Sequence, residues 1–202
     1  MSAGETVSRR TAVMMVLALA GCSGSFRTFY DEPAPSQGWR IAAVDVTVPR
    51  TLSVSEEEVF VPRADIVWRE DPPGDRYNQV AAIMKDAISR GAAGLKGSRA
   101  VRLEVTMRRF HAMTFTAETR APAGVHNIEF DITARDARTG EVLAGPELIE
   151  ASFPAMTGAA MARARLEGQS QRSQITDHVA RTIASWLGLI PDNRQTFSSV
   201  GA

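Results

Sequence analysis

Residues 101–109 read VRLEVTMRR and residues 128–135 read IEFDITAR. In both stretches apolar and polar residues alternate, which puts the apolar side chains on one face of a β-strand and the charged side chains on the other. The sequence DARTGE (136–141) follows the second stretch, and Gly140 in it predicts a hairpin turn. These stretches predict the centre of an antiparallel sheet with one apolar face to cover and one polar face.

Three further stretches have the pattern of strands. Residues 40–48 alternate, residues 64–69 form a short second strand, and residues 142–153 return from the predicted turn. The last stretch contains Gly145-Pro146, a pair that is typical of an edge strand or a bulge.

Two stretches have the apolar period of a helix. The first follows Asp75, which is suited to cap a helix N-terminus, and the second runs from Ser173 to Gly188. The resulting order is β-β-α-β-β-β-α. It predicts an α+β fold: a two-layer sandwich in which a mostly antiparallel sheet of four to five strands carries both amphipathic helices on one face.

The first 22 residues have the pattern of an export signal. Two arginines precede an apolar run of nine residues (12–20), which is too short to cross a bilayer as a helix. Leu19-Ala20-Gly21-Cys22 then matches the bacterial lipobox, in which cleavage between Gly21 and Cys22 precedes lipid attachment to the cysteine. A plain secretory peptide, or a buried core cysteine, is the alternative. Cys22 is the only cysteine of the chain and stands at the one position that the motif requires, which favours the lipobox.

The route and destination are predicted from the residues beside this motif. Ser8-Arg9-Arg10 resembles part of a twin-arginine signal, but Ala12 and Val13 weaken the match, so the general secretion route is favoured. Ser23 rather than Asp follows the cysteine, which favours the outer membrane over the inner membrane. We expect a periplasm-facing protein held to the membrane by acyl chains such as palmitate.

The chain is predicted to contain a single domain with tails. The predicted parts are a signal peptide (1–21), the lipidated cysteine with a flexible tether (22–38), one α+β domain (39–190) and a frayed C-terminal tail (191–202). The tether is inferred because its Ser, Gly and Pro residues follow no apolar period. Its aromatic residues either pack on the domain, which is favoured, or enter the lipid interface.

Composition excludes several classes of function. The chain has 23 Lys and Arg residues and 23 Asp and Glu residues, so no net field steers it to nucleic acid, and no nucleic-acid partner is predicted. A single cysteine excludes an intramolecular disulfide and any metal site built from several cysteines.

The side chains that carry chemistry show no catalytic arrangement in the sequence. His111 and His126 lie near facing strand ends, where a chance neighbourhood is favoured over a ligand pair, and His178 is predicted to be a partly buried helix residue. Carboxylates on the polar sheet face alternate with arginines, which is typical of cross-strand ion pairs. No metal, no cofactor and no enzymatic activity are predicted.

Several short pieces of the chain carry a resemblance to a known family. Val48-Pro49, the stretch ADIVWR (64–69) and Trp186-Leu187-Gly188 resemble an uncharacterised family of alphaproteobacterial lipoproteins of unknown function. More distantly, the element order is similar to that of PqiC-type transport auxiliary lipoproteins and of the lipopolysaccharide-assembly lipoprotein LptE. The resemblance implies a lipid-anchored domain that serves a larger envelope machine through its surfaces.

The favoured function is that of a non-enzymatic accessory or binding component of an envelope transport or assembly complex. Residues 154–169, rich in Ala, Met and Arg, are the predicted partner surface. Its candidate contacts are Met156, Met161, Arg163 and Arg165.

Two alternatives remain. The domain could be a carrier that binds a lipid or another apolar ligand between helices and sheet, with Met84, Met107 and Met113 as adaptable lining. An enzyme, the least favoured class, would instead need a pocket that gathers several polar groups.

Overall fold

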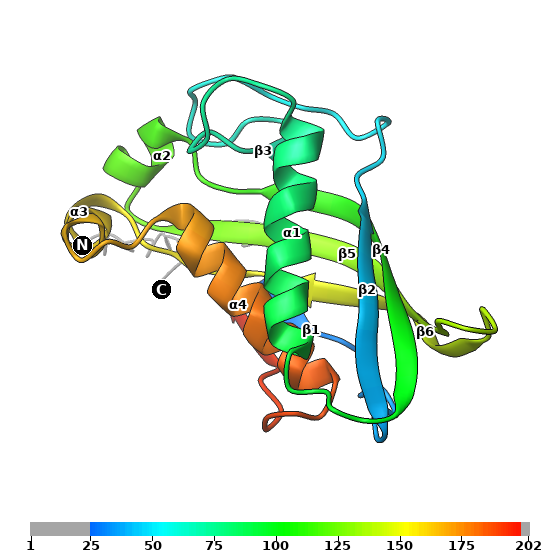
Figure 1. Cartoon of the computed structure of the whole chain (residues 1–202). Helices are drawn as coiled ribbons and strands as arrows, with labels where there is room; N and C mark the ends of the chain where they lie inside the picture. Colours follow the sequence, from blue (N-terminus) through cyan, green and yellow to red (C-terminus); the bar gives the residue numbers. More distant parts are fainter. Residues whose placement is uncertain (1–24, 199–202) are drawn as a thin grey trace, which may run out of the picture.

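A computed structural model describes residues 25–198 as one sheet flanked by helices (Figure 1). The strands are β1 (Ser25–Phe29), β2 (Trp39–Thr47), β3 (Ile66–Val67), β4 (Arg99–His111), β5 (Gly124–Asp136), β6 (Val142–Ala151), β7 (Phe153–Ala155) and β8 (Gln195–Ser198). The helices are α1 (Arg76–Ala92), α2 (Phe115–Arg120), α3 (Gly158–Leu166) and α4 (Gln171–Trp186). The sheet has the order β2-β4-β5-β6-β1-β8, with β3 beside β4 and β7 beside β5.

The centre of the sheet is the antiparallel pair β4 and β5, as predicted. Val105 lies opposite Ile132 and Leu103 opposite Ala134, and all four side chains are buried. Gly140 adopts a positive φ of 77° in the turn that leads to β6. The Gly145-Pro146 pair lies at a bulge, because β6 is an inner strand and its register against β5 shifts there.

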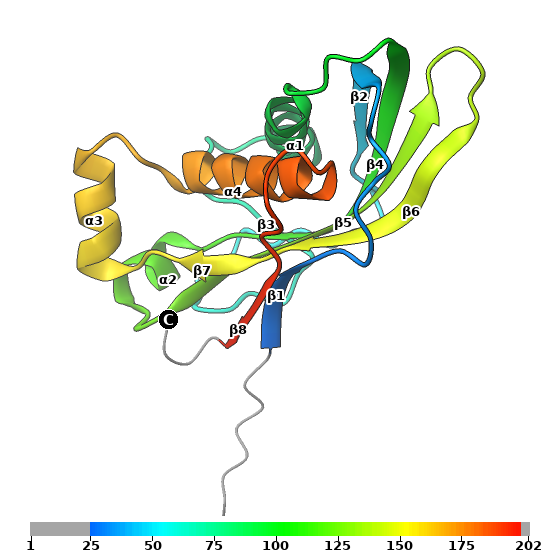
Figure 2. The same ribbon diagram turned by 90° about the horizontal axis from the view of Figure 1, so that it is seen from below.

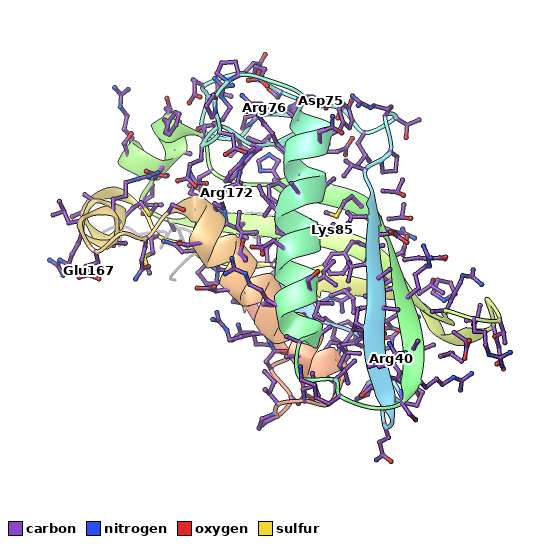
Figure 3. All side chains as sticks on the ribbon, in the orientation of Figure 1. Arg40, Asp75, Arg76, Lys85, Glu167 and Arg172 are labelled. Carbon is purple, nitrogen blue, oxygen red and sulfur yellow. The ribbon has the colours of Figure 1, made fainter. Side chains whose placement is uncertain are left out.

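Helices α1 and α4 cover one face of this sheet (Figure 2). Asp75 caps α1, accepting a hydrogen bond of 3.2 Å from the backbone N–H of Asn78, and it lies at the start of the helix (Figure 3). The two helices approach closely at Gly91, where a Cβ atom would lie 2.4 Å from the carbonyl oxygen of Ala180. The predicted α+β class, the helix layer and the antiparallel centre are therefore confirmed.

The sheet is larger than the four to five strands predicted. Strand β2 pairs with β4 in parallel, with Val44 opposite Leu103, and α1 provides the crossover that a parallel pair requires. Helices α2 and α3 were not predicted, because each is short and has no sustained apolar period. Within the described part of the chain, no helix is both long enough and apolar enough to cross a membrane.

The predicted flexible tether and frayed tail are wrong where the structure describes them. Strand β1 pairs with β6 and with β8, so the ordered domain extends at least from Ser25 to Ser198 (Figure 2). The favoured packing of the tether aromatics is confirmed for Tyr30, which is buried with its hydroxyl 2.7 Å from Ser185 Oγ. The predicted signal peptide and cleavage site, Gly21 and Cys22, lie outside the described residues.

Candidate functional site

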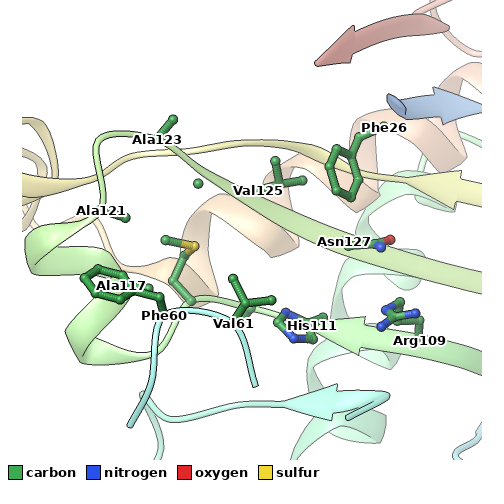
Figure 4. Close-up of a pocket in the computed structure, with 13 residues that line it drawn as sticks. Phe26, Phe60, Val61, Arg109, His111, Ala117, Ala121, Ala123, Val125 and Asn127 are labelled. Atoms are coloured by element: carbon green, nitrogen blue, oxygen red, sulfur yellow. The ribbon is translucent and has the colours of Figure 1, made fainter. Parts of the chain in front are cut away.

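A pocket of about 390 Å³ lies at one end of β4 and β5 (Figure 4). Its floor includes His111 of β4 and Asn127 of β5, which are directly opposite each other across the strands. Their neighbours Phe110 and Ile128 belong to the core beneath the helices. Because successive side chains of a strand point to opposite faces, the pocket lies on the sheet face that α1 and α4 leave uncovered.

The walls of the pocket come from three separate segments, which are α2, the loop before β3, and β1. Together with the floor, the lining is Phe26, Phe60, Val61, Arg109, His111, Ala112, Met113, Ala117, Ala121, Ala123, Gly124, Val125 and Asn127. Most of these side chains are apolar. The polar ones, Arg109, His111 and Asn127, lie together at one end of the pocket, which we call its polar end (Figure 4).

Thr114 fixes two of these walls. Its hydroxyl caps α2 by accepting a hydrogen bond of 3.0 Å from the backbone N–H of Ala117, and it donates one of 2.8 Å to the carbonyl of Val59. The second bond holds the loop that carries Phe60 and Val61 over the pocket. A capping threonine therefore joins α2 to a loop that lies 55 residues earlier in the chain.

Two carboxylates that precede Phe60 and Val61, those of Glu56 and Glu58, also hold this loop in place. Glu58 Oε2 accepts a hydrogen bond of 3.0 Å from the backbone N–H of Phe115, and Glu58 Oε1 lies 2.7 Å from Arg69 Nε. Glu56 pairs with Arg76, whose side chain is buried. In the described part of the chain, no group of three or more His, Cys, Asp or Glu side chains is placed to hold a metal ion.

Met113 and Gly124 form a matched pair in the pocket wall. A Cβ atom at Gly124 would lie 2.3 Å from Met113 Cε, so a larger residue here would make the end of the methionine side chain move. The thioether side chain is flexible and can adjust its shape to a bound group. Of the three methionines proposed as ligand lining, Met113 lies at a pocket, whereas Met84 and Met107 are packed within the core between helices and sheet.

A shallower hollow adjoins the polar end of the pocket and shares Val61, Arg109 and His111 with it. Its remaining lining includes Arg63 and Asp65. Between residues 25 and 198, no carboxylate oxygen lies within 4 Å of the guanidinium of Arg63 or Arg109. The Nε atom of Arg109 is buried and has no hydrogen-bond partner among the described residues, and its Nη2 atom donates to the Ala64 carbonyl at 3.4 Å.

The other ionisable groups of this hollow have partners. Asp65 accepts hydrogen bonds of 2.9 and 2.7 Å from the backbone N–H and hydroxyl of Ser53, which lower the pKa of its carboxyl group. His111 Nε2 lies 3.1 Å from the Pro62 carbonyl, an atom that only accepts, so this nitrogen carries the proton. Burial lowers the pKa of His111, so its ring is neutral at pH 7.

The other two histidines lie on the helix side of the sheet. Phe153 stacks between them, with ring centroids 4.9 Å from His126 and 4.3 Å from His178. Thr28 Oγ1 donates its single proton to Ser152 O, so His178 Nε2, 3.0 Å away, donates to this hydroxyl. Burial lowers the pKa of His126 to about 3 and that of His178 to about 4. His111 and His126 thus point to opposite faces and form no ligand pair.

The four residues predicted to contact a partner have different environments. Met156 and Arg163 are exposed, whereas Met161 is buried beneath α3 and does not reach the surface. Arg165 binds Glu118 through hydrogen bonds of 3.0 and 2.9 Å. The sequence reasoning missed Leu166, whose side chain at the end of α3 is 90% exposed.

Together these features define a two-layer α+β domain with an apolar pocket on its open sheet face, with Arg109 at the polar end of the pocket and Arg63 in the adjoining hollow. A family model matches residues 39–202, and the chain belongs to this family of unknown function, DUF6778. None of the curated proteins matches the sequence.

Several solved structures are similar to this chain at low sequence identity. Protein XCC0632 from Xanthomonas campestris, of the DUF330 family, is 15% identical with a TM-score of 0.42, and the match covers 75% of this chain and 90% of that chain. A PelC dodecamer from Paraburkholderia phytofirmans is 12% identical with a TM-score of 0.36, covering 81% and 97%. A predicted lipoprotein from Caulobacter crescentus is 17% identical with a TM-score of 0.35, covering 54% and 83%.

Proposed function

We propose that this protein is a lipid-anchored, periplasm-facing envelope protein that acts by binding rather than by catalysis, as an accessory component of an envelope transport or assembly complex. The observation that carries the proposal is the position of the lipobox relative to the fold. Cys22 precedes Ser25, the first residue of β1, by only three residues. Three residues span at most about 10 Å, so an anchored domain would lie directly at the membrane surface.

The strength of the anchor follows from the number of acyl chains. One chain holds a protein only reversibly, whereas two or more give stable attachment at about 0.8 kcal/mol per buried CH₂ group. Ser23 after the cysteine supports the outer membrane as the destination.

Helix α3 supports the binding role. Its buried side chains are Met161 and Ala164, and Arg165 pairs with Glu118, whereas Arg163 and Leu166 face outwards. An apolar side chain as exposed as Leu166 gains free energy when a partner covers it. We therefore place the partner contact on Met156, Arg163 and Leu166.

The proposal is tested by fractionating cells that make the full chain or its Cys22→Ser variant. We expect the wild-type chain in the membrane fraction and the variant in the soluble periplasmic fraction. A photo-crosslinking residue at position 166 should capture an envelope protein, and the same probe at Ala82, exposed on α1, should not. An unchanged membrane location of the Cys22→Ser variant, or equal capture from both positions, contradicts the proposal.

A further inference from the structure

We propose that the pocket on the open sheet face binds one acyl chain of an anionic amphiphile, and that Arg63 and Arg109 hold the phosphate or carboxylate group of that molecule. This goes beyond the proposed function, because it assigns a ligand to the domain whether or not Cys22 carries a lipid.

The apolar part of the pocket fits a hydrocarbon chain. Its volume of about 390 Å³ lies in the range of small-molecule sites, which is roughly 300–1,000 Å³. Phe60 and Val61 at its rim are 52% and 76% exposed, so they extend the apolar surface of the pocket into solvent. A hydrocarbon chain in the pocket would remove this surface from water, which stabilises the complex by about 25 cal/mol for each Å² of apolar area buried.

The polar end fits an anionic group. Arg109 lies where the pocket and the adjoining hollow meet, and Arg63 lies in the hollow. Among residues 25–198, the guanidinium group of Arg109 donates one long hydrogen bond, from Nη2 to the Ala64 carbonyl at 3.4 Å, so the N–H groups of its outer end remain available to an anionic acceptor in the pocket. Asp65 is the one carboxylate lining the hollow, and its charge also interacts with Arg109, so two guanidinium groups against one carboxylate leave the hollow with a net positive charge. Arginine also matches the oxygens of phosphate and carboxylate groups in a bidentate manner.

The orientation of the pocket is consistent with a lipid source. Phe26 lines the pocket and belongs to β1, the strand that follows the lipobox. It lies four residues after Cys22, so on the proposed function the pocket would open close to the bilayer, within about 14 Å of the attachment point. The pocket could then receive a chain from an adjacent lipid.

The experiment uses the full chain in cells, with p-benzoyl-phenylalanine in place of Phe60 at the pocket rim. After illumination, the intact mass of the purified protein should show adducts with the mass of a glycerophospholipid or of a fatty acid, which identifies the source. The same probe at Ala82, which is exposed on α1 over the opposite face of the sheet, should give at least fivefold less adduct. A polypeptide adduct in place of a lipid would overturn the proposal in favour of a protein partner.

Two variants test the two halves of the site. Ala121→Phe fills the pocket, and Arg63→Gln with Arg109→Gln removes the charge at its end. Each should lower the adduct yield at position 60 at least fivefold. The matched controls place the same changes on exposed positions of α1 and α4: Ala82→Phe, and Arg90→Gln with Arg181→Gln. These controls should leave the adduct yield at position 60 unchanged. Thermal unfolding of each variant identifies any loss of folding. If Ala121→Phe does not fold, the variant Arg63→Gln with Arg109→Gln provides the test, because neither arginine forms an ion pair within residues 25–198.

The Cys22→Ser chain separates this proposal from the proposed function. Lipid adducts that persist at position 60 in this unanchored chain support the pocket, even if Cys22 proves to be unmodified in the wild type. Adducts that disappear with the anchor report contact with the membrane surface alone and overturn the pocket assignment. Equal adduct yields in the wild type and in the arginine variant overturn the anion site.

Discussion

His126 and His178 illustrate how single residues set the stability of this fold. Both are buried beside Phe153, and burial lowers the pKa of His126 to about 3 and that of His178 to about 4. An unfolded histidine has a pKa near 6.5. Below that pH, the unfolded chain therefore binds protons that the folded chain does not.

We predict that the free energy of unfolding is nearly constant above pH 7 and falls as the pH is lowered from about 6.5 towards 4. Each histidine contributes up to about 1.4 kcal/mol per pH unit in this window. Urea unfolding between pH 5 and 8 measures the effect. His126→Leu should reduce the slope, while His178 and His111, whose pKa burial also lowers, keep their contributions. A free energy of unfolding that does not change between pH 7 and 5 would be incompatible with two buried neutral histidines.

Gly91 provides a second prediction at this scale. In an exposed helix, alanine is more stable than glycine by about 1 kcal/mol. Here the added Cβ would meet the Ala180 carbonyl oxygen at 2.4 Å, so Gly91→Ala should instead lower the free energy of unfolding by about 1–3 kcal/mol. Chemical denaturation checks this, with Ser89→Ala on the exposed side of α1 as the control. Stabilisation by Gly91→Ala would show that the two helices do not touch at this residue.

At the scale of elements, Glu118 links the helices that the sequence did not show. Its side chain is 7% exposed and accepts hydrogen bonds from Arg165 of α3 and, at 2.6 Å, from Gln171 Nε2 of α4. The alternating strands and the two long amphipathic helices could be predicted because a single period repeats along each of them. Helix α2 could not, because its position depends on Thr114, Glu58 and Glu118, whose partners lie about 50 residues away in the sequence.

We predict that Glu118→Ala lowers the free energy of unfolding by about 2–3 kcal/mol. The substitution removes the buried acceptor of two hydrogen bonds from Arg165 and one from Gln171, which leaves Gln171 Nε2 with only the Met113 carbonyl at 3.3 Å. The Glu141 side chain, which pairs with Arg99, is 66% exposed, so Glu141→Ala should change the free energy of unfolding by less than about 1 kcal/mol. The midpoints of urea unfolding compare the two variants. Equal effects would place Glu118 outside the network that joins α2, α3 and α4.

At the scale of the whole molecule, the first and last strands of the described part of the chain complete the sheet. β1 lies between β6 and β8, so the segment predicted as a tether and part of the predicted tail are neighbouring strands. The sequence could not show this, because β1 is held by backbone pairing and by the buried hydroxyl of Thr28 rather than by an apolar period. The pocket was equally hidden, since three segments that are distant in the sequence line it.

This arrangement predicts the pattern of limited proteolysis. Arg27 lies in a strand that is paired on both sides, whereas Arg138 lies in the exposed turn between β5 and β6. Trypsin should therefore cut native protein after Arg138 at least tenfold faster than after Arg27, as timed by mass spectrometry. Early cleavage after Arg27 would contradict the pairing of β1 and support the flexible tether predicted from the sequence.

The central claim, that the domain is held at the membrane through Cys22, is tested most directly by the mass of the N-terminal peptide of the full chain recovered from cells. The account predicts a peptide that begins at Cys22 and carries the mass of a diacylglycerol, with or without a further acyl chain. A peptide that retains residues before Cys22 with an unmodified thiol, or a chain that begins after Cys22, would contradict it.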